Sequence, residues 1–156
     1  YRQPLDWTPE TPKAARAALD RLYGALRDQP VAEPSPGDMA PVLAALDDDL
    51  NTPAAFAALH TLAAQIHSEA DPRRRAQIAA GLGKAGSFLG LLQQDPVAWA
   101  HAGAGEVDQI EALVAKRAHA RLDHDWQRAD ELRDRLLALG VEVEDSCGES
   151  RWRMRA

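Results

Sequence analysis

The sequence predicts a mainly α protein: an antiparallel helical bundle, followed by a small α+β lobe of two helices and a C-terminal β-hairpin. Apolar residues recur every three or four positions over most of the chain, which indicates amphipathic helices. Clusters of Gly and Pro separate these segments and mark the connections. Only residues 140–156, GVEVEDSCGESRWRMRA, alternate apolar and polar side chains on either side of a polar turn, which is typical of two strands.

Residues 1–92 are predicted to form four helices of the bundle. Capping residues followed by Pro mark three of the helix starts, at Thr8, at Asn51 (or Asp49) and at Asp71. The glycines of the fourth helix are expected to weaken or bend it. The predicted buried stripe of the third helix consists of Phe56, Leu59, Leu62, Ala63 and Ile66.

A connector at 93–105, with one helical turn expected around Trp99, leads to the second lobe at 106–156. Its first helix is predicted to end at Leu122, and Asp125 can cap the next helix. Gly140 provides the glycine that commonly ends a helix, and the hairpin follows directly.

Composition excludes several classes of protein. The net charge of −6 argues against a general polyanion binder, although it permits one local basic face. A single cysteine, Cys147, excludes an internal disulfide framework and a multi-cysteine zinc site, and it fits a reducing, cytoplasmic location. No apolar run approaches the roughly 18 residues of a membrane span, so no membrane partner is expected. The chain begins without Met, and we interpret it as part of a longer protein.

Neither a catalytic site nor a metal site is predicted. The acidic run 47–49 cannot converge on one ion, because successive helix residues point about 100° apart. His60 and His67 lie two helical turns apart, which is too far to share a metal. Cys147 has no base at a fixed spacing, and the sequence contains no glycine-rich phosphate loop.

The tail has two interpretations. Arg151, Arg153 and Arg155 alternate with Trp152 and Met154, so that on a strand the guanidinium groups would share one face. The tryptophan and methionine would then pack against the lobe. The stretch alone favours a structural edge strand with solubilising charges over an RNA contact.

The preceding helix pair also has two interpretations. Arg117 and Arg121 share one helix face, and Trp126, Asp130 and Arg133 share another. Aromatic and guanidinium planes stack on unpaired bases, and carboxylates accept hydrogen bonds from exocyclic amines. Alternatively, Trp126 opens the buried stripe of its helix and the charges form ordinary surface pairs.

Four stretches carry a resemblance to a known family. They are YRQPLDW at 1–7, ARAALDRLYGALR at 15–27, LDDDLNTPAA at 46–55, and DHDWQRADELRDRLLALGVEVED at 123–145 followed by Trp152-Arg153. Together they resemble the C-terminal region, helical bundle plus anticodon-binding domain, of bacterial class I cysteinyl-tRNA synthetases. The third stretch is similar to the family's Met-Asp-Asp-Asp-Phe-Asn-Thr-Pro motif, with Leu46 for Met and Leu50 for Phe.

The resemblance implies a tRNA-binding function. The last lobe would recognise the GCA anticodon of tRNA-Cys, so that an upstream catalytic domain, missing here with its signatures, could charge it with cysteine. ATP and zinc would belong to that domain, and this monomeric segment would hold no cofactor. The resemblance assigns the anticodon contacts to Arg121, Trp126, Asp130, Asp145, Trp152 and Arg153; charge and spacing add Arg133, Arg151 and Arg155 as phosphate contacts.

One departure from the family pattern affects the hairpin turn, where Gly148 comes one position early and Glu149 precedes Ser150. Two rival functions remain. The chain could be a non-catalytic helical protein-interaction or scaffold module without RNA binding, which predicts an exposed apolar patch on the bundle. It could also derive from a related cysteine ligase that acts on an amino sugar, although such an enzyme has no need of an anticodon-reading lobe.

Overall fold

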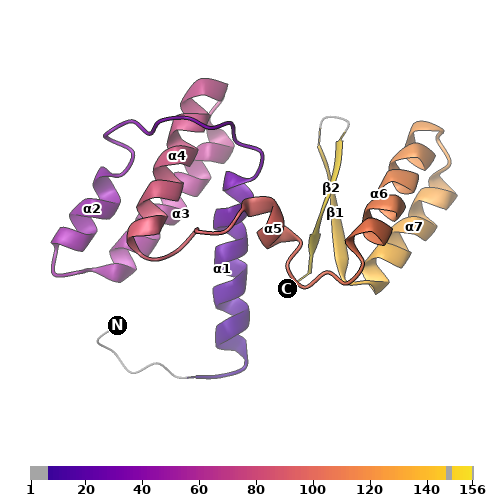
Figure 1. Ribbon diagram of the computed structural model, residues 1–156, viewed down its shortest axis with the longest axis horizontal. Coiled ribbons are helices and arrows are strands. Elements are labelled where there is room, and N and C mark those ends of the chain that lie inside the picture. The colour runs from indigo at the N-terminus through magenta and orange to yellow at the C-terminus, as the bar shows by residue number, and fades with distance from the viewer. Residues whose placement is uncertain (1–6, 147–148, 156) are drawn as a thin grey trace. The chain divides into compact units, whose positions relative to one another are not determined.

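The computed structural model describes residues 7–146 and 149–155. Over these residues the chain forms seven helices and a two-stranded antiparallel sheet, which confirms the predicted mainly α class (Figure 1). The chain divides into two compact units, Tyr1–Val97 and Ala98–Ala156. The boundary falls inside the predicted connector, and the short helix α5 (Pro96–Ala100) contains the helical turn expected there.

The first unit contains the four predicted bundle helices. They are α1 (Glu10–Leu26), α2 (Ala40–Asp47), α3 (Thr52–Ser68) and α4 (Pro72–Phe88). Helix α3 contacts α1, α2 and α4, and is therefore the central helix of this unit.

Two of the three predicted helix starts are confirmed. The side chains of Asn51 and Asp71 accept backbone N–H hydrogen bonds at the N-termini of α3 and α4. The third prediction is wrong in detail, because α1 begins at Glu10 and Thr8 is not its cap. Pro9 already has helical dihedral angles and takes the cap position itself, with no side-chain hydrogen bond.

The buried stripe of α3 differs from the prediction by one position. Phe56 is 42% exposed, and Ala55 occupies the buried position instead. The stripe is set by contacts of α3 with three neighbouring helices, where the small side chain of alanine allows close packing. The core residues that α3 contributes are Ala55, Leu59, Leu62, Ala63 and Ile66.

Helix α4 is continuous from Pro72 to Phe88, and two of its glycines, Gly81 and Gly86, permit close packing. A Cβ atom added to Gly81 would lie 2.6 Å from the Cβ of Asp38, and one added to Gly86 would lie 2.6 Å from Leu92 Cδ1. Both glycines are buried. That these glycines weaken or bend the helix stays a prediction, which did not include their role in packing.

An ion pair between the buried Asp38 and the partly exposed Arg74 joins the loop before α2 to α4. Asp38 is 4% exposed, and Arg74 donates hydrogen bonds to both of its carboxylate oxygens, at 3.0 and 2.5 Å. The backbone N–H of Ser35 donates a third at 2.9 Å. The hydrogen bond to Asp38 raises the pKa of Arg74. The two partners lie 36 residues apart, and the sequence analysis did not pair them.

The second unit has the predicted helix-helix-hairpin order. Its elements are α6 (Val107–Leu122), α7 (Trp126–Ala138), β1 (Val141–Ser146) and β2 (Glu149–Met154). Asp125 caps α7 as predicted, by accepting a hydrogen bond from the N–H of Arg128. Gly140 adopts a φ of 74° between α7 and β1, a left-handed conformation that favours glycine.

The hairpin packs against both helices of this unit. Helices α6 and α7 lie side by side, β1 contacts α7 and β2 contacts α6 (Figure 1). The strand register pairs Val143 with Trp152 and Asp145 with Ser150. The core of this unit consists of Ile110, Val114, Leu136, Val141 and Trp152.

Candidate nucleic-acid interface

Trp126, the first residue of α7, is 57% exposed. The alternative in which it opens the buried stripe is therefore wrong. The adjacent turn orients it: His124 adopts a left-handed φ of 59°, and its ring lies 5.7 Å from the indole ring at 59°. An indole on the surface at a helix N-terminus can stack on a flat ligand. The buried face of α7 consists of Ala129, Leu132 and Leu136.

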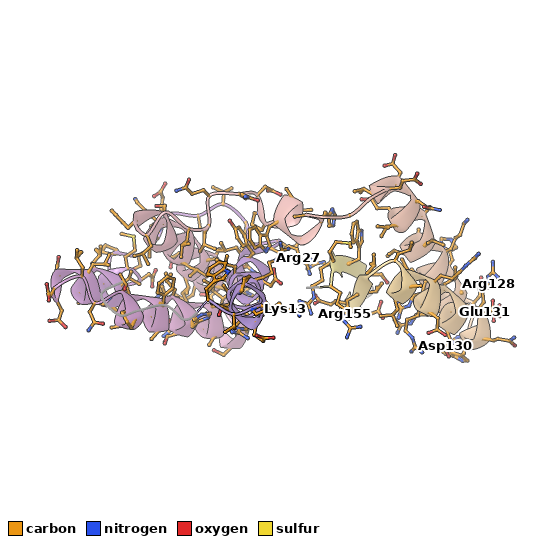
Figure 2. The ribbon with its side chains drawn as sticks, turned by 90° about the horizontal axis from the view of Figure 1, so that it is seen from below. Lys13, Arg27, Arg128, Asp130, Glu131 and Arg155 are labelled. Carbon is orange, nitrogen blue, oxygen red and sulfur yellow. The ribbon has the colours of Figure 1, made fainter. Side chains whose placement is uncertain are left out.

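Asp130 and Arg133 lie on the solvent face of α7 and form an ion pair at 3.3 Å. Their side chains are 64% and 53% exposed, and Figure 2 shows Asp130 projecting outward from the lobe. Exposed pairs of this kind contribute little to stability. Both groups can therefore be redirected to a ligand at small cost.

Asp145, at the end of β1, is held by a group of donors that we call the Asp145 cluster: Arg117, Arg121 and Ser150 with Asp145 itself. The two terminal nitrogens of Arg117 donate one hydrogen bond to each carboxylate oxygen, both at 2.9 Å. Arg121 Nη1 donates to Oδ2, and Ser150 Oγ donates to Oδ1 at 2.7 Å. These contacts, chiefly the Arg117 hydrogen bond, hold the pKa of Asp145 well below its usual range.

The structure thus brings together two pairs of predicted site residues: Arg121 with Asp145 in this cluster, and Asp130 with Arg133 on α7. It adds Arg117, which the sequence analysis placed on the same helix face as Arg121 but did not assign to the site. The spacing of four residues between Arg117 and Arg121 could have indicated this role. A carboxylate that reaches Arg121 on α6 also reaches the residue one helical turn away, which is Arg117.

Trp152 lies inside the lobe. It is 5% exposed, and its ring stacks on His101 with a centroid separation of 3.8 Å and an interplanar angle of 3°. This placement agrees with the structural interpretation of the tail, in which the tryptophan anchors the last strand. The ring is not presented to a ligand in this arrangement.

The arginines of β2 share their face with acids of β1. The register sets Glu142 opposite Arg153 and Glu144 opposite Arg151. Arg153 donates to Glu142 at 2.7 Å and lies 3.1 Å from Glu144, and Arg155 lies 3.8 Å from Glu142. The predicted guanidinium face is therefore partly neutralised by Glu142 and Glu144, which lie on the neighbouring strand.

Within 7–146 and 149–155, no three His, Cys, Asp or Glu residues are arranged to hold a metal ion. Among the same residues, none of the helices has the length and apolar character needed to cross a bilayer. Cys147 and Gly148, and with them the turn that departs from the family pattern, lie outside the described residues.

The described residues thus form a helical bundle and a small lobe that carries an exposed tryptophan and an arginine-bound carboxylate. Comparison with protein families assigns both parts: residues 41–93 match the DALR domain, and residues 105–153 match the cysteinyl-tRNA ligase anticodon binding domain. The chain belongs to the anticodon-binding part of the cysteine–tRNA ligase family, which confirms the resemblance noted in its sequence.

Curated relatives named cysteine–tRNA ligase match nearly the whole chain. That of Parvibaculum lavamentivorans is 45% identical over 163 residues, covering 99% of this chain and 34% of its own length. Those of Xanthomonas campestris pv. campestris and Caulobacter vibrioides are 45% and 44% identical, over 98% and 99% of this chain. The chain spans about a third of the length of these relatives, at 34% and 35% for the latter two.

Proposed function

We propose that this chain binds tRNA-Cys through its second unit and reads the GCA anticodon. A catalytic domain outside this chain, in the same cytoplasmic and monomeric enzyme, then charges the tRNA with cysteine, and ATP and zinc are used there. The observation that carries the proposal is the exposed indole of Trp126, which lies within the match at 105–153. That the amino acid is cysteine follows from the name of the relatives, cysteine–tRNA ligase.

Trp126 would supply affinity by stacking on an unpaired anticodon base. Stacking on an aromatic side chain contributes roughly 1–3 kcal/mol per base and tolerates any base. The indole is already exposed at the N-terminus of α7, so it needs no rearrangement to accept a base.

The carboxylates of Asp130 and Asp145 would supply discrimination. An ionised carboxylate accepts hydrogen bonds from exocyclic amino groups, which guanine, cytosine and adenine all carry. Uracil carries a carbonyl oxygen where cytosine carries its amino group, and that oxygen would face the carboxylate. A site built around such hydrogen bonds strongly rejects bases that cannot make them.

Arg133, Arg151 and Arg155 would contact phosphates. The carboxylates paired with Arg133 and Arg155 are exposed and half-exposed, and such pairs exchange readily for a phosphate. With a net charge of −6, the chain should bind random RNA weakly and depend on the local fit around the anticodon.

The first unit would act as a strut between the lobe and the catalytic domain. The rival scaffold function predicts an apolar patch on this unit, and Val31, Leu50, Phe56 and Phe88 are indeed exposed there. They come from different loops and helices, however, and the family match covers both units. RNA binding is therefore the better supported function.

Titration of the full chain with a tRNA anticodon stem-loop carrying GCA, followed by tryptophan fluorescence, tests the proposal. Three further stem-loops each change one anticodon base. We expect saturable quenching with GCA, weaker binding of the changed loops, and loss of the quenching in Trp126→Ala. Phe88→Ala is the matched control, because Phe88 is an aromatic side chain of similar exposure, 59%, on the first unit. Equal binding of all four loops would contradict anticodon reading.

A further inference from the structure

We propose that Arg117 is the positioning residue of the base-reading carboxylate: it holds Asp145 in place from α6, while Arg121 is the exchangeable partner that gives up Asp145 when RNA binds. The inference rests on the proposed function, since it concerns how the Asp145 cluster accepts a base. It assigns different tasks to two arginines that occupy the same helix face one turn apart.

The carboxylate of Asp145 has no acceptor position to spare. An ionised carboxylate offers about four lone-pair positions. Arg117 fills two of them, Arg121 one and Ser150 one. A base amino group can therefore bind Asp145 only if one of these donors leaves.

Exposure and bonding indicate which donor leaves. The side chain of Arg117 is 11% exposed, whereas that of Arg121 is 39% exposed. Arg117 would have to break two hydrogen bonds and Arg121 only one. Once released, Arg121 remains at the surface, where its guanidinium group can take a phosphate of the anticodon loop.

The fork of Arg117 fixes the plane of the carboxylate. Two parallel hydrogen bonds from one guanidinium group set both the position and the orientation of the two oxygens. The lone pair that Arg121 vacates then points in a fixed direction, so that only a base with an amino group at that place is accepted.

A merely structural role is the competing explanation, since Arg117 also ties the hairpin to α6. The two roles differ in what they change. A structural link affects how much of the protein is folded, and therefore the binding of every RNA equally. A positioning role affects the ratio between the dissociation constants of two RNAs, and this ratio does not depend on the folded fraction of a sample titrated with both.

The experiment uses the full chain, the GCA stem-loop and the three single-base changes, with dissociation constants from fluorescence anisotropy over a range of salt concentrations. Asp145→Asn first identifies the base whose discrimination depends on the carboxylate. We expect Arg117→Gln to reduce discrimination at that same base by on the order of tenfold, without changing the slope of log Kd against log salt. Arg117→Lys should not rescue it, because lysine lacks the fork.

Arg121→Gln is expected to behave differently. It should weaken all four stem-loops and reduce the salt slope by about 0.7, the value for one phosphate contact on a single strand. Lys116→Gln is the matched control for both variants. It removes one positive charge at an exposed position of α6 next to Arg117, and it should leave the discrimination between stem-loops unchanged.

The outcomes separate the inference from the function on which it rests. If the unmodified chain does not prefer GCA, the proposed function fails, and the inference fails with it. If the unmodified chain prefers GCA and Arg117→Gln keeps the full preference, only the inference is overturned. A reduced salt slope in Arg117→Gln would also overturn it, because Arg117 would then touch the RNA itself.

Discussion

Replacing Gly81 with alanine tests the packing of α4 against the loop that carries Asp38. The new Cβ atom would lie 2.6 Å from the Cβ of Asp38, well inside van der Waals contact. Asp38 cannot easily move away, because Arg74 and the N–H of Ser35 hold its carboxylate and it is 4% exposed. Relief would require the loop before α2 to shift.

Two opposing terms set the magnitude. Alanine favours the helix over glycine by about 0.8–1.0 kcal/mol. Overpacking of a buried site costs typically about 1–3 kcal/mol, and the rigid neighbour places Gly81 in the upper part of that range. We expect Gly81→Ala to lower the free energy of unfolding of the first unit by about 1–2 kcal/mol. Gly83→Ala, with no atom within 4 Å of its new Cβ, should instead raise it by up to about 1 kcal/mol.

Urea unfolding followed by far-UV circular dichroism measures the effect, and amide hydrogen exchange in α3 and α4 assigns it to the first unit. The two variants differ only in the position of one methyl group within the same helix. If both raise the urea midpoint by the same amount, the close approach of Asp38 to α4 is refuted.

Three further predictions concern the two units. Trp152→Ala is expected to lower the free energy of unfolding of the second unit by about 3–5 kcal/mol, whereas Trp126→Ala should change it by less than about 0.5 kcal/mol, as thermal melts of the two variants can show. The lowered pKa of Asp145 means that its ion pairs stabilise the fold above its unfolded pKa of about 3.9. The urea midpoints of Asp145→Asn and the unmodified chain should therefore differ at about pH 6 and converge as the pH falls below about 4. A difference between the two midpoints that stays constant with pH would contradict this. Arg74→Met should cost about 2–3 kcal/mol in urea unfolding, less than a fully buried pair, because Arg74 is partly exposed while its partner Asp38 is not.

Local signals in the sequence were sufficient for the element order. Asn51 and Asp71 cap their helices through residues two or three positions away, so the information lies within one helical turn. The alternation of the tail placed Trp152 on the inner face of the hairpin for the same local reason. The prediction of Thr8 as the cap of α1 is wrong because Pro9 takes that position. Residue preferences alone do not decide between the two positions.

Tertiary contacts decided what the periodicity could not. A helical stripe shifted by one residue turns by about 100°, and only the neighbours of α3 determine that Ala55 rather than Phe56 is buried. The pair of Asp38 and Arg74 joins elements 36 residues apart and has no local signal.

In the candidate site, too, the sequence identified some residues and only the tertiary structure identified the others. The sequence placed Arg121, Trp126 and Asp145 at the site through the resemblance, but left open whether Trp126 is buried. It did not assign Arg117, because the carboxylate that Arg117 binds belongs to a hairpin 28 residues further along the chain. The acids of β1 that oppose the arginines of β2 became visible only with the strand register.

We propose that Trp126 receives an anticodon base at the surface of the second unit, whereas Trp152 belongs to its core. The indole N–H resonances of the ¹⁵N-labelled full chain distinguish the two residues, because the four tryptophans report separately within one titration. With the GCA stem-loop we predict a saturable shift of the Trp126 resonance, a smaller shift with single-base changes, and a Trp152 resonance that stays in place. An unmoved Trp126 resonance, or one that shifts equally with every stem-loop, would show that Trp126 does not receive an anticodon base.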